Sequence, residues 1–353
     1  MNAFLLTIFM LIACSCSVMA LDKPIAVPQR QKLELGKELG KYNFSVYANR
    51  SLNSDMSRIR HIAIIQHGLQ RNGLDYFNAG MKLMAASGNN ADKMLLIAPD
   101  FFATPDISLE VPQGYPIWKV MGWPSGDDSI NTPHVSSFQV FDDLLSLLAD
   151  KTRFPALVSI VVAGHSDGGA FIQRYAALNK IHKKLKSAGV DLHYVIANSP
   201  SYLYFTHERP NGHGFTPYDV GACPTYNDYR YGMDKRIPYA GDRTGSQLFM
   251  RYANRDITYL LGSEDKDPNH RLLDKSCGAE AQGGNRLKRG LAYIRYERHL
   301  ADNQIKLKRR AYEVIGVGHN YEEMFVSKCA ASAIFGVPEE KNPSGVVCRD
   351  ISN

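Results

Sequence analysis

The chain has 353 residues, of which 44% are hydrophobic and 22% are charged, a composition typical of a globular protein with a large core. Its formal net charge is +6, from 41 basic and 35 acidic residues. This excess is too small and too dispersed to predict nucleic-acid binding. The basic stretch from Arg286 to Arg310 is interpreted as a solvated face.

The first twenty residues have the pattern of a targeting segment. The apolar run Phe4–Ala13 is too short to span a bilayer of about 30 Å, and small residues follow it. Val18–Ala20 fits a signal-peptidase site, whereas Leu11–Cys14 resembles a bacterial lipobox whose Cys14 would be lipidated. We therefore expect residues 1–20 to be a signal peptide or a lipoprotein signal, with a buried N-terminal helix as the alternative. The protein is expected to be exported: secreted, periplasmic, or anchored to a membrane only through Cys14.

Short apolar, β-branched runs alternate with amphipathic helical patterns along the rest of the chain. Strands are expected at 44–47, 61–66, 94–98, 157–163, 194–197, 257–261 and 312–317. Helices are expected at 74–86, 138–150, 169–187 and 286–298. Such runs are typical of strands buried on both faces of a mostly parallel sheet. Residues 21–353 are therefore predicted to form a single doubly wound α/β domain with right-handed crossovers.

Two segments interrupt this alternation, at about 101–133 and 201–256. Both are rich in Tyr, Pro, Gly and Asp, and both begin where an expected strand ends. Open α/β sheets bind ligands beyond the carboxyl ends of their strands. We therefore expect these insertions to form the walls or lid of a substrate cleft. Their aromatic side chains, such as Trp118, Trp123 and Tyr202, would either line that cleft or pack the loops.

Four cysteines remain after the targeting segment: Cys223, Cys277, Cys329 and Cys348. An even number of cysteines in an exported chain predicts disulfides, and four cysteines allow three pairings. We expect Cys329 to pair with Cys348 across a short C-terminal loop, and Cys223 to pair with Cys277 between Gly- and Asp-rich segments. Four reduced, buried cysteines are the alternative. No metal site is expected, because no close cysteine pair has metal-ligand spacing.

The pentapeptide Gly164–Gly168, Gly-His-Ser-Asp-Gly, is the most informative motif. It follows the apolar run 157–163 directly and precedes a helical pattern, which indicates a strand, a sharp turn and a helix. This arrangement places Ser166 at the apex in a strained backbone conformation, while the glycines let strand and helix approach closely. The motif alone is weak, and its placement between a buried strand and a helix is what indicates a nucleophile.

A nucleophilic serine needs a base to accept its proton and an acid to orient that base. Among 11 histidines, His319 directly follows Gly318 and the last expected strand, so its side chain can reach back toward the carboxyl edge of the sheet. The strand at 257–261 ends in an acidic turn that contains Asp265 and Asp267. The order along the chain is serine, acid, histidine.

That order, on those strands, resembles the α/β-hydrolase superfamily over roughly residues 44–331. Gln66–Leu69, Gln-His-Gly-Leu, is similar to the family's His-Gly turn after an early strand. The resemblance implies Ser166 as nucleophile, Asp265 as orienting acid and His319 as base. It also implies an oxyanion hole formed by the backbone N–H groups of Leu69 and Asp167.

Three features near the motif leave alternatives open. Asp267 shares the acidic turn, but it precedes Pro268 and is biased toward an extended, outward-facing conformation. His67 and His165 neighbour the expected site and are interpreted as turn-packing residues. An aspartate follows the serine where a small or aliphatic residue is more usual in the family, which puts substrate preference in doubt more than chemistry.

The sequence therefore predicts an exported serine hydrolase that works through an acyl-enzyme. The expected substrate is a carboxylic ester, either a small molecule or a polymer. No cofactor is expected, because no cofactor motif is present. Fold and triad do not determine the leaving group, so a peptidase or amidase of the same fold is one alternative. A non-catalytic binding module of the hydrolase fold is another.

Overall fold

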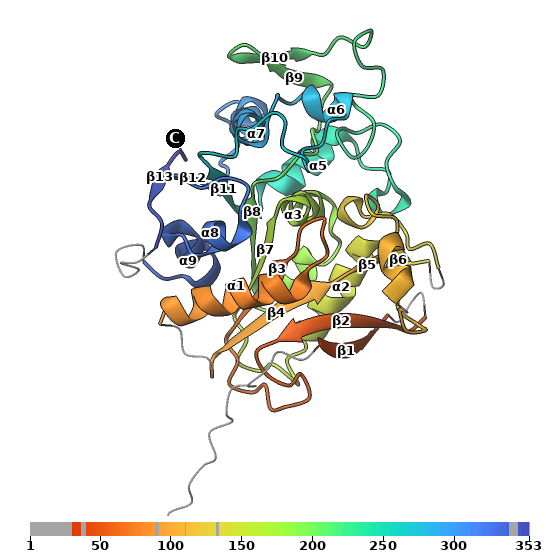
Figure 1. The fold of residues 1–353 in the computed structure, drawn as a ribbon, viewed down its shortest axis with the longest axis vertical. Helices are drawn as coiled ribbons and strands as arrows, with labels where there is room; N and C mark the ends of the chain where they lie inside the picture. Colours follow the sequence, from red (N-terminus) through yellow and green to blue (C-terminus); the bar gives the residue numbers. More distant parts are fainter. Residues whose placement is uncertain are drawn as a thin grey trace, which may run out of the picture.

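The structure is a computed structural model that describes residues 30–36, 40–88, 92–109, 111–131, 134–338 and 345–352. The expected targeting segment and Cys14 lie outside the described residues. A nine-stranded sheet with strand order β1-β2-β4-β3-β7-β8-β11-β12-β13 forms the centre (Figure 1). Its strands are β1 (Arg30–Leu35), β2 (Tyr42–Ala48), β3 (His61–Gln66), β4 (Met94–Asp100), β7 (Ser159–His165), β8 (Asp191–Ala197), β11 (Asp256–Gly262), β12 (Arg309–Val314) and β13 (Cys348–Asp350).

The six inner strands from β4 to β12 are parallel, whereas β1, β2 and β13 pair in antiparallel fashion at the edges. This arrangement confirms the predicted mostly parallel sheet. In the register, His165 lies opposite Ala197, and Gly262 lies opposite Val314. The carboxyl ends of β7, β8, β11 and β12 therefore meet at one edge of the sheet. Residues that follow these strands can converge there.

Helices cover both faces of the sheet (Figure 1). One face carries α1 (Gly73–Ala86), α8 (Tyr321–Phe325) and α9 (Lys328–Phe335), and the other carries α2 (Ser137–Leu148), α3 (Asp167–Leu178), α5 (Gly245–Ala253) and α7 (Arg286–Ala301). Along β3, Ile62 and Ile64 pack on the second face, while Ala63 and Ile65 pack on the first. Burial on both faces explains why these strands are continuous apolar runs rather than alternating patterns.

The helix expected over 169–187 is two helices, α3 and α4 (His182–Ser187), so the prediction of one helix is wrong. Asn179 causes the break, because its backbone is extended, with φ −53° and ψ 151°. Its side-chain Nδ2 donates to Tyr175 O at 2.8 Å, and its Oδ1 accepts from the N–H of His182 at 3.1 Å. One amide thus ends the first helix and begins the second.

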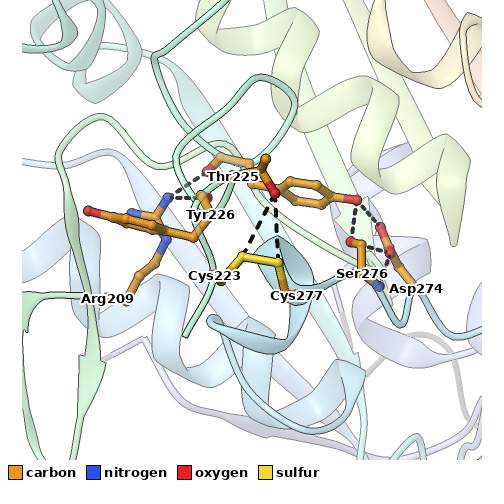
Figure 2. Close-up of a disulfide and its surroundings, with 8 residues drawn as sticks. Arg209, Cys223, Thr225, Tyr226, Asp274, Ser276 and Cys277 are labelled. Atoms are coloured by element: carbon orange, nitrogen blue, oxygen red, sulfur yellow. Dashed lines mark hydrogen bonds between the residues drawn. A yellow bond between two sulfur atoms is a disulfide. The ribbon is translucent and has the colours of Figure 1, made fainter. Parts of the chain in front are cut away.

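The two insertions fold mainly into short elements: β5 (Phe102–Ala103), 3₁₀ turns at Thr104–Leu109 and Trp123–Ser125, β6 (Ile117–Trp118), β9 (Glu208–Asn211), β10 (Gly214–Pro217), a 3₁₀ turn at Pro238–Ala240, and α5. A disulfide between Cys223 and Cys277 joins the second insertion to α6 (Cys277–Glu280), with Cα atoms 5.8 Å apart (Figure 2). A second disulfide, Cys329–Cys348, joins α9 to β13. These are the two pairings expected from the sequence. Among the described helices, none is both long and apolar enough to cross a membrane.

Candidate active site

Ser166 occupies the turn between β7 and α3. Its φ of 58° and ψ of −128° lie in a region that non-glycine residues rarely adopt, at a cost of about 1–3 kcal/mol. A Cβ at Gly164 would lie 2.3 Å from Gly168 O, and one at Gly168 would lie 2.4 Å from His67 O. Both flanking positions therefore require glycine. The N–H of Ser166 donates to Ala197 O at 3.0 Å, which ties the turn to β8.

Ser166, His319 and Asp265 form a continuous hydrogen-bonded relay. His319 Nδ1 lies 2.7 Å from Asp265 Oδ2, and His319 Nε2 lies 2.9 Å from Ser166 Oγ. A carboxylate only accepts, so Nδ1 carries the ring proton and Nε2 accepts the hydroxyl hydrogen of the serine. The structure thus brings together the three side chains expected from the sequence, in the geometry that proton transfer from Ser166 needs.

The acidic turn presents Asp265 to the histidine and directs Asp267 elsewhere. The N–H of Asp265 donates to Gly262 O at 3.1 Å, and its carbonyl accepts from the N–H of Leu287 at 3.1 Å. The turn is thereby tied to the start of α7. Asp267 is exposed, and its Oδ1 accepts from the N–H of Asn269 at 2.8 Å. Of the two carboxylates, Asp265 is the one within reach of His319.

Arg286, the first residue of α7, lies against the second oxygen of Asp265. Its Nη1 is 3.3 Å from Asp265 Oδ1, and its Nη2 donates to Leu272 O at 2.6 Å. Both partners of the ion pair are buried, with side chains 1% and 3% exposed. Burial lowers the pKa of His319 below its usual 6.5; the hydrogen bond with Asp265 opposes that shift, and the charge of Arg286 adds to it. The imidazole is therefore kept neutral and able to accept a proton.

The interpretation of the basic stretch as a solvated face is wrong for three of its arginines. Arg286 and Arg289 are 1% and 0% exposed, and Arg309 forms a buried ion pair with Glu297 at 2.9 Å. A single sequence does not distinguish an arginine that caps a loop from one that faces solvent. Arg286 is thus a residue of the site that the sequence analysis missed.

Asn198 is a second residue that the sequence analysis missed. It follows β8 with a φ of 43° and is 1% exposed. Its Oδ1 accepts from the N–H of Gly262 at 2.7 Å, and its Nδ2 donates to Gly318 O at 3.0 Å. One side chain thereby ties the loop of the acid to the loop of the histidine. An asparagine directly after a buried strand, where a positive φ is tolerated, was the available signal.

His67 and His165 are buried at the turns, as interpreted from the sequence. His67 Nδ1 donates to Gly68 O at 2.8 Å, while its Nε2 accepts from the N–H of Phe101 at 3.1 Å. Burial lowers the pKa of His67 to about 4, so it is a neutral structural residue. The ring of His165 packs against His319 with centroids 4.7 Å apart, and burial holds its pKa well below 6.5.

A cavity of about 330 Å³ opens above the serine. Its lining comes from residues 68–70, 72 and 76, from His165 and Ser166, and from 270–272 and 319–322. Beyond the relay the lining is largely polar: Gln70, Asn72, His270, Arg271, Asn320 and Glu322. Leu69 belongs to this lining, and Asp167 is the first residue of α3. Within the described chain, neither of their backbone N–H groups donates to another protein group, which leaves both available to a ligand.

Neither insertion contributes a described residue to this lining, so the expected walls are formed by other segments. Trp118, Trp123, Tyr202 and Tyr204 are 0% exposed and belong to the hydrophobic core. Their burial agrees with the alternative that these aromatic side chains pack the loops rather than line the cleft. The rim is built by the turn after β3, the loop after β11 and the start of α8.

Asp167 directly follows Ser166 and is 4% exposed. Burial raises its pKa, while the charges of Arg230, Arg174 and Arg286 oppose that rise. The position after Ser166 thus carries a buried acid that interacts with three arginines. Among the described residues, no three His, Cys, Asp or Glu side chains are grouped as metal ligands would be.

No protein-family model matches the chain, and no curated protein matches it in sequence. Solved structures are similar in fold. Poly(aspartic acid) hydrolase-1 from Sphingomonas sp. KT-1 superposes with a TM-score of 0.60 at 18% identity, covering 87% of this chain and 99% of that one. A poly(3-hydroxybutyrate) depolymerase from Bordetella parapertussis gives a TM-score of 0.58 at 19% identity, covering 88% and 90%. These similarities confirm the α/β-hydrolase fold.

Proposed function

We propose that this protein is an exported serine hydrolase whose substrate is a carboxylic ester. The single observation that carries the proposal is the relay from Asp265 through His319 to Ser166, with distances of 2.7 and 2.9 Å, at a strained turn beneath a cavity. The two similar structures support it, because both of those proteins are described as degrading polymers of small acids. A short ester or a polymer of short units suits a cavity of this size and polarity.

The proposed reaction proceeds in two acyl transfers. Ser166 Oγ attacks the ester carbonyl while His319 Nε2 takes its proton, and Asp265 stabilises the imidazolium that forms. The N–H groups of Leu69 and Asp167 donate hydrogen bonds to the carbonyl oxygen as it becomes negatively charged, and each such donor is worth about 2.7–4 kcal/mol. The C–O bond breaks, and the alcohol leaves with the proton from His319. Water then repeats the sequence on the acyl-enzyme and releases the acid and free Ser166.

Export is supported by the two disulfides, since such bonds persist in oxidising compartments. An amidase or peptidase of the same fold is the second candidate, because one similar protein is described as a poly(aspartic acid) hydrolase and a fold does not determine the leaving group. The relay itself accepts either leaving group. The choice between them is left to a substrate panel.

A fluorophosphonate probe tests the mechanism, and a panel of short and long p-nitrophenyl esters beside peptide amides tests the substrate. We expect the probe to label the native protein and the surface control Ser57→Ala, but not Ser166→Ala. Ser166→Ala should fold normally and lose several orders of magnitude in turnover, because a triad acts as a unit. Near-normal ester hydrolysis by Ser166→Ala would remove the serine mechanism. Absence of both labelling and hydrolysis in the native protein would favour a binding module.

A further inference from the structure

A second cavity, of about 390 Å³, lies away from the triad between the end of α3 and α5. These two helices pack against each other (Figure 1). Its lining residues are Lys180, Lys183, Arg243, Arg251, Asn254 and Arg255. Arg255 directly precedes β11, whereas Asp265 follows that strand. The cavity therefore lies at the edge of the sheet opposite the catalytic relay, and the two sites share no residue.

Positive charge in this cavity is not balanced by its lining. Five of the six lining side chains are cationic, and none of the lining residues is acidic. The neighbouring His182 responds to this field: burial and then the charges of Arg255, Lys186 and Arg251 lower its pKa to about 3. Such a field attracts anions and raises their local concentration.

Asp142 is an acidic residue close to the cations of the cavity, and both of its carboxylate oxygens already accept hydrogen bonds from tyrosines. Asp142, on α2, is 5% exposed and does not line the cavity, although it interacts electrostatically with Lys180. Its Oδ1 accepts the hydroxyl of Tyr175 at 2.7 Å, and its Oδ2 accepts that of Tyr239 at 2.6 Å. The charge of Asp142 therefore acts on Lys180 from outside the lining and offsets only part of the positive charge of the five cations.

Two arginines of the lining are built into the fold rather than free on the surface. Arg255 is 6% exposed, and its Nε donates to Ala176 O at 3.2 Å. Arg251 Nη2 donates to Asn179 O at 2.7 Å. These bonds cap the end of α3 and orient both guanidinium groups. Arg251 Nη1 is buried and has no hydrogen-bond partner within the described chain, and a buried donor without a partner is unfavourable.

We propose that this cavity binds a phosphate group. Arg251 and Arg255 supply oriented N–H donors for its oxygens, and Lys180, Lys183 and Arg243 supply the remaining positive charge. Guanidinium groups match a tetrahedral oxyanion in geometry and form its strongest hydrogen bonds in proteins. The phosphate comes either from a free ion or from the headgroup of a lipid, and both present the same chemistry to the cavity.

Calorimetric titration of inorganic phosphate into the mature protein, at constant ionic strength, tests the site. We expect saturable one-to-one binding that weakens about tenfold or more in Arg243→Gln, because one of the five positive charges that line the cavity is lost. Arg243 is exposed, so its replacement leaves the core intact. Lys184→Gln is the matched control: it removes an exposed cation from α4 that does not line the cavity, and it should change affinity less than about twofold.

Flotation with vesicles distinguishes the two sources of phosphate. Vesicles of phosphatidylcholine alone are compared with vesicles that contain phosphatidic acid. Binding of free phosphate identifies the ion as ligand, and binding only of phosphatidic acid vesicles identifies a headgroup. Either result supports the site if Arg243→Gln weakens the binding about tenfold or more and Lys184→Gln changes it less than about twofold. Absence of both, or equal losses in the two variants, overturns the proposal. Ester turnover should be unchanged in both variants, so this test is independent of the catalytic one.

Discussion

At the scale of single residues, the choice between two acids depends on one contact. Asp265 Oδ2 lies 2.7 Å from His319 Nδ1, whereas Asp267 is exposed and accepts from its own turn. In serine proteases, loss of the acid that holds the tautomer costs up to about 10⁴ in turnover. We expect Asp265→Asn to approach that loss, and Asp267→Asn to cost less than about tenfold, equivalent to 1.36 kcal/mol.

Turnover of the two purified variants, measured on the same ester, checks this expectation. Circular dichroism of both variants controls for folding. The reverse ranking would move the acid to Asp267 while leaving Ser166 and His319 in their roles.

Arg286 is expected to set the acidic limb of the pH profile. The base must be neutral, so activity is present above the pKa of His319 and is lost as pH falls through it. Since burial and Arg286 lower that pKa, the limb should lie below pH 6.5 in the native protein. Arg286→Gln removes a positive charge beside the imidazole, which should raise the pKa and move the limb to higher pH. Profiles of kcat/KM measure the shift.

Arg286→Lys is the matched control, because it keeps the charge and loses the bond from Nη2 to Leu272 O. It should move the limb less than Arg286→Gln does. An unchanged limb in Arg286→Gln would show that Arg286 only supports the loop. Equal shifts in both variants would assign the effect to loop position rather than to charge.

At the scale of elements, the sheet could be predicted because its strands are buried on both faces. The run at 61–66 coincides with β3, and the run at 94–98 lies within β4. The three side chains of the relay could be predicted for the same reason, since each directly follows one of these strands or a short loop after it. The start of a strand could not be predicted where polar residues extend it. For example, β12 begins at Arg309, three residues before the apolar run at 312–317.

Other features could not be predicted, because they depend on contacts between residues far apart in the sequence. Asn179 breaks a helix because its amide bonds both flanking helices, although the apolar spacing continues across it. The aromatic insertions pack into the core instead of forming the described rim of the cavity. The local sequence around Arg286 is typical of a solvent-exposed cation. The residue is buried because the start of α7 places it against the carboxylate of Asp265.

The two disulfides join elements over loops of different length, and their contributions to stability should differ accordingly. Cys223 and Cys277 are 54 residues apart, and Cys329 and Cys348 are 19 apart. A disulfide stabilises by about 2–4 kcal/mol, and the entropic part grows with the logarithm of loop length. The longer loop should therefore contribute about 1 kcal/mol more. Paired Cys→Ala variants compared by urea denaturation measure the difference.

Non-reducing peptide mapping of the exported protein is the control for that experiment. Recovery of four free thiols would contradict the pairing. An equal loss of stability in the two paired variants would show that contacts of the reduced chain, rather than loop entropy, dominate.

At the scale of the whole molecule, the relay is a property of the complete sheet. Ser166 and His319 are 153 residues apart, and Asp265 lies 54 residues before His319. They meet because β7, β11 and β12 are parallel and end at one edge. The phosphate cavity lies at the other edge, so one sheet separates the proposed chemistry from the proposed anion site. An anion at the far edge would leave access to Ser166 open.

Residues 1–20 carry two competing patterns that determine whether the mature chain would be anchored to a membrane. Val18–Ala20 fits a signal-peptidase site, whereas Leu11–Cys14 resembles a bacterial lipobox. If Cys14 is lipidated, its acyl chains should carry the mature protein into the detergent phase, and Cys14→Ala should release it to the aqueous phase. Cys16→Ala, two residues away, is the matched control and should leave partitioning unchanged. Detergent phase separation measures the partitioning of both variants, and N-terminal sequencing identifies the first residue of the mature chain. An unmodified mature chain that begins at Leu21 would establish cleavage by ordinary signal peptidase instead.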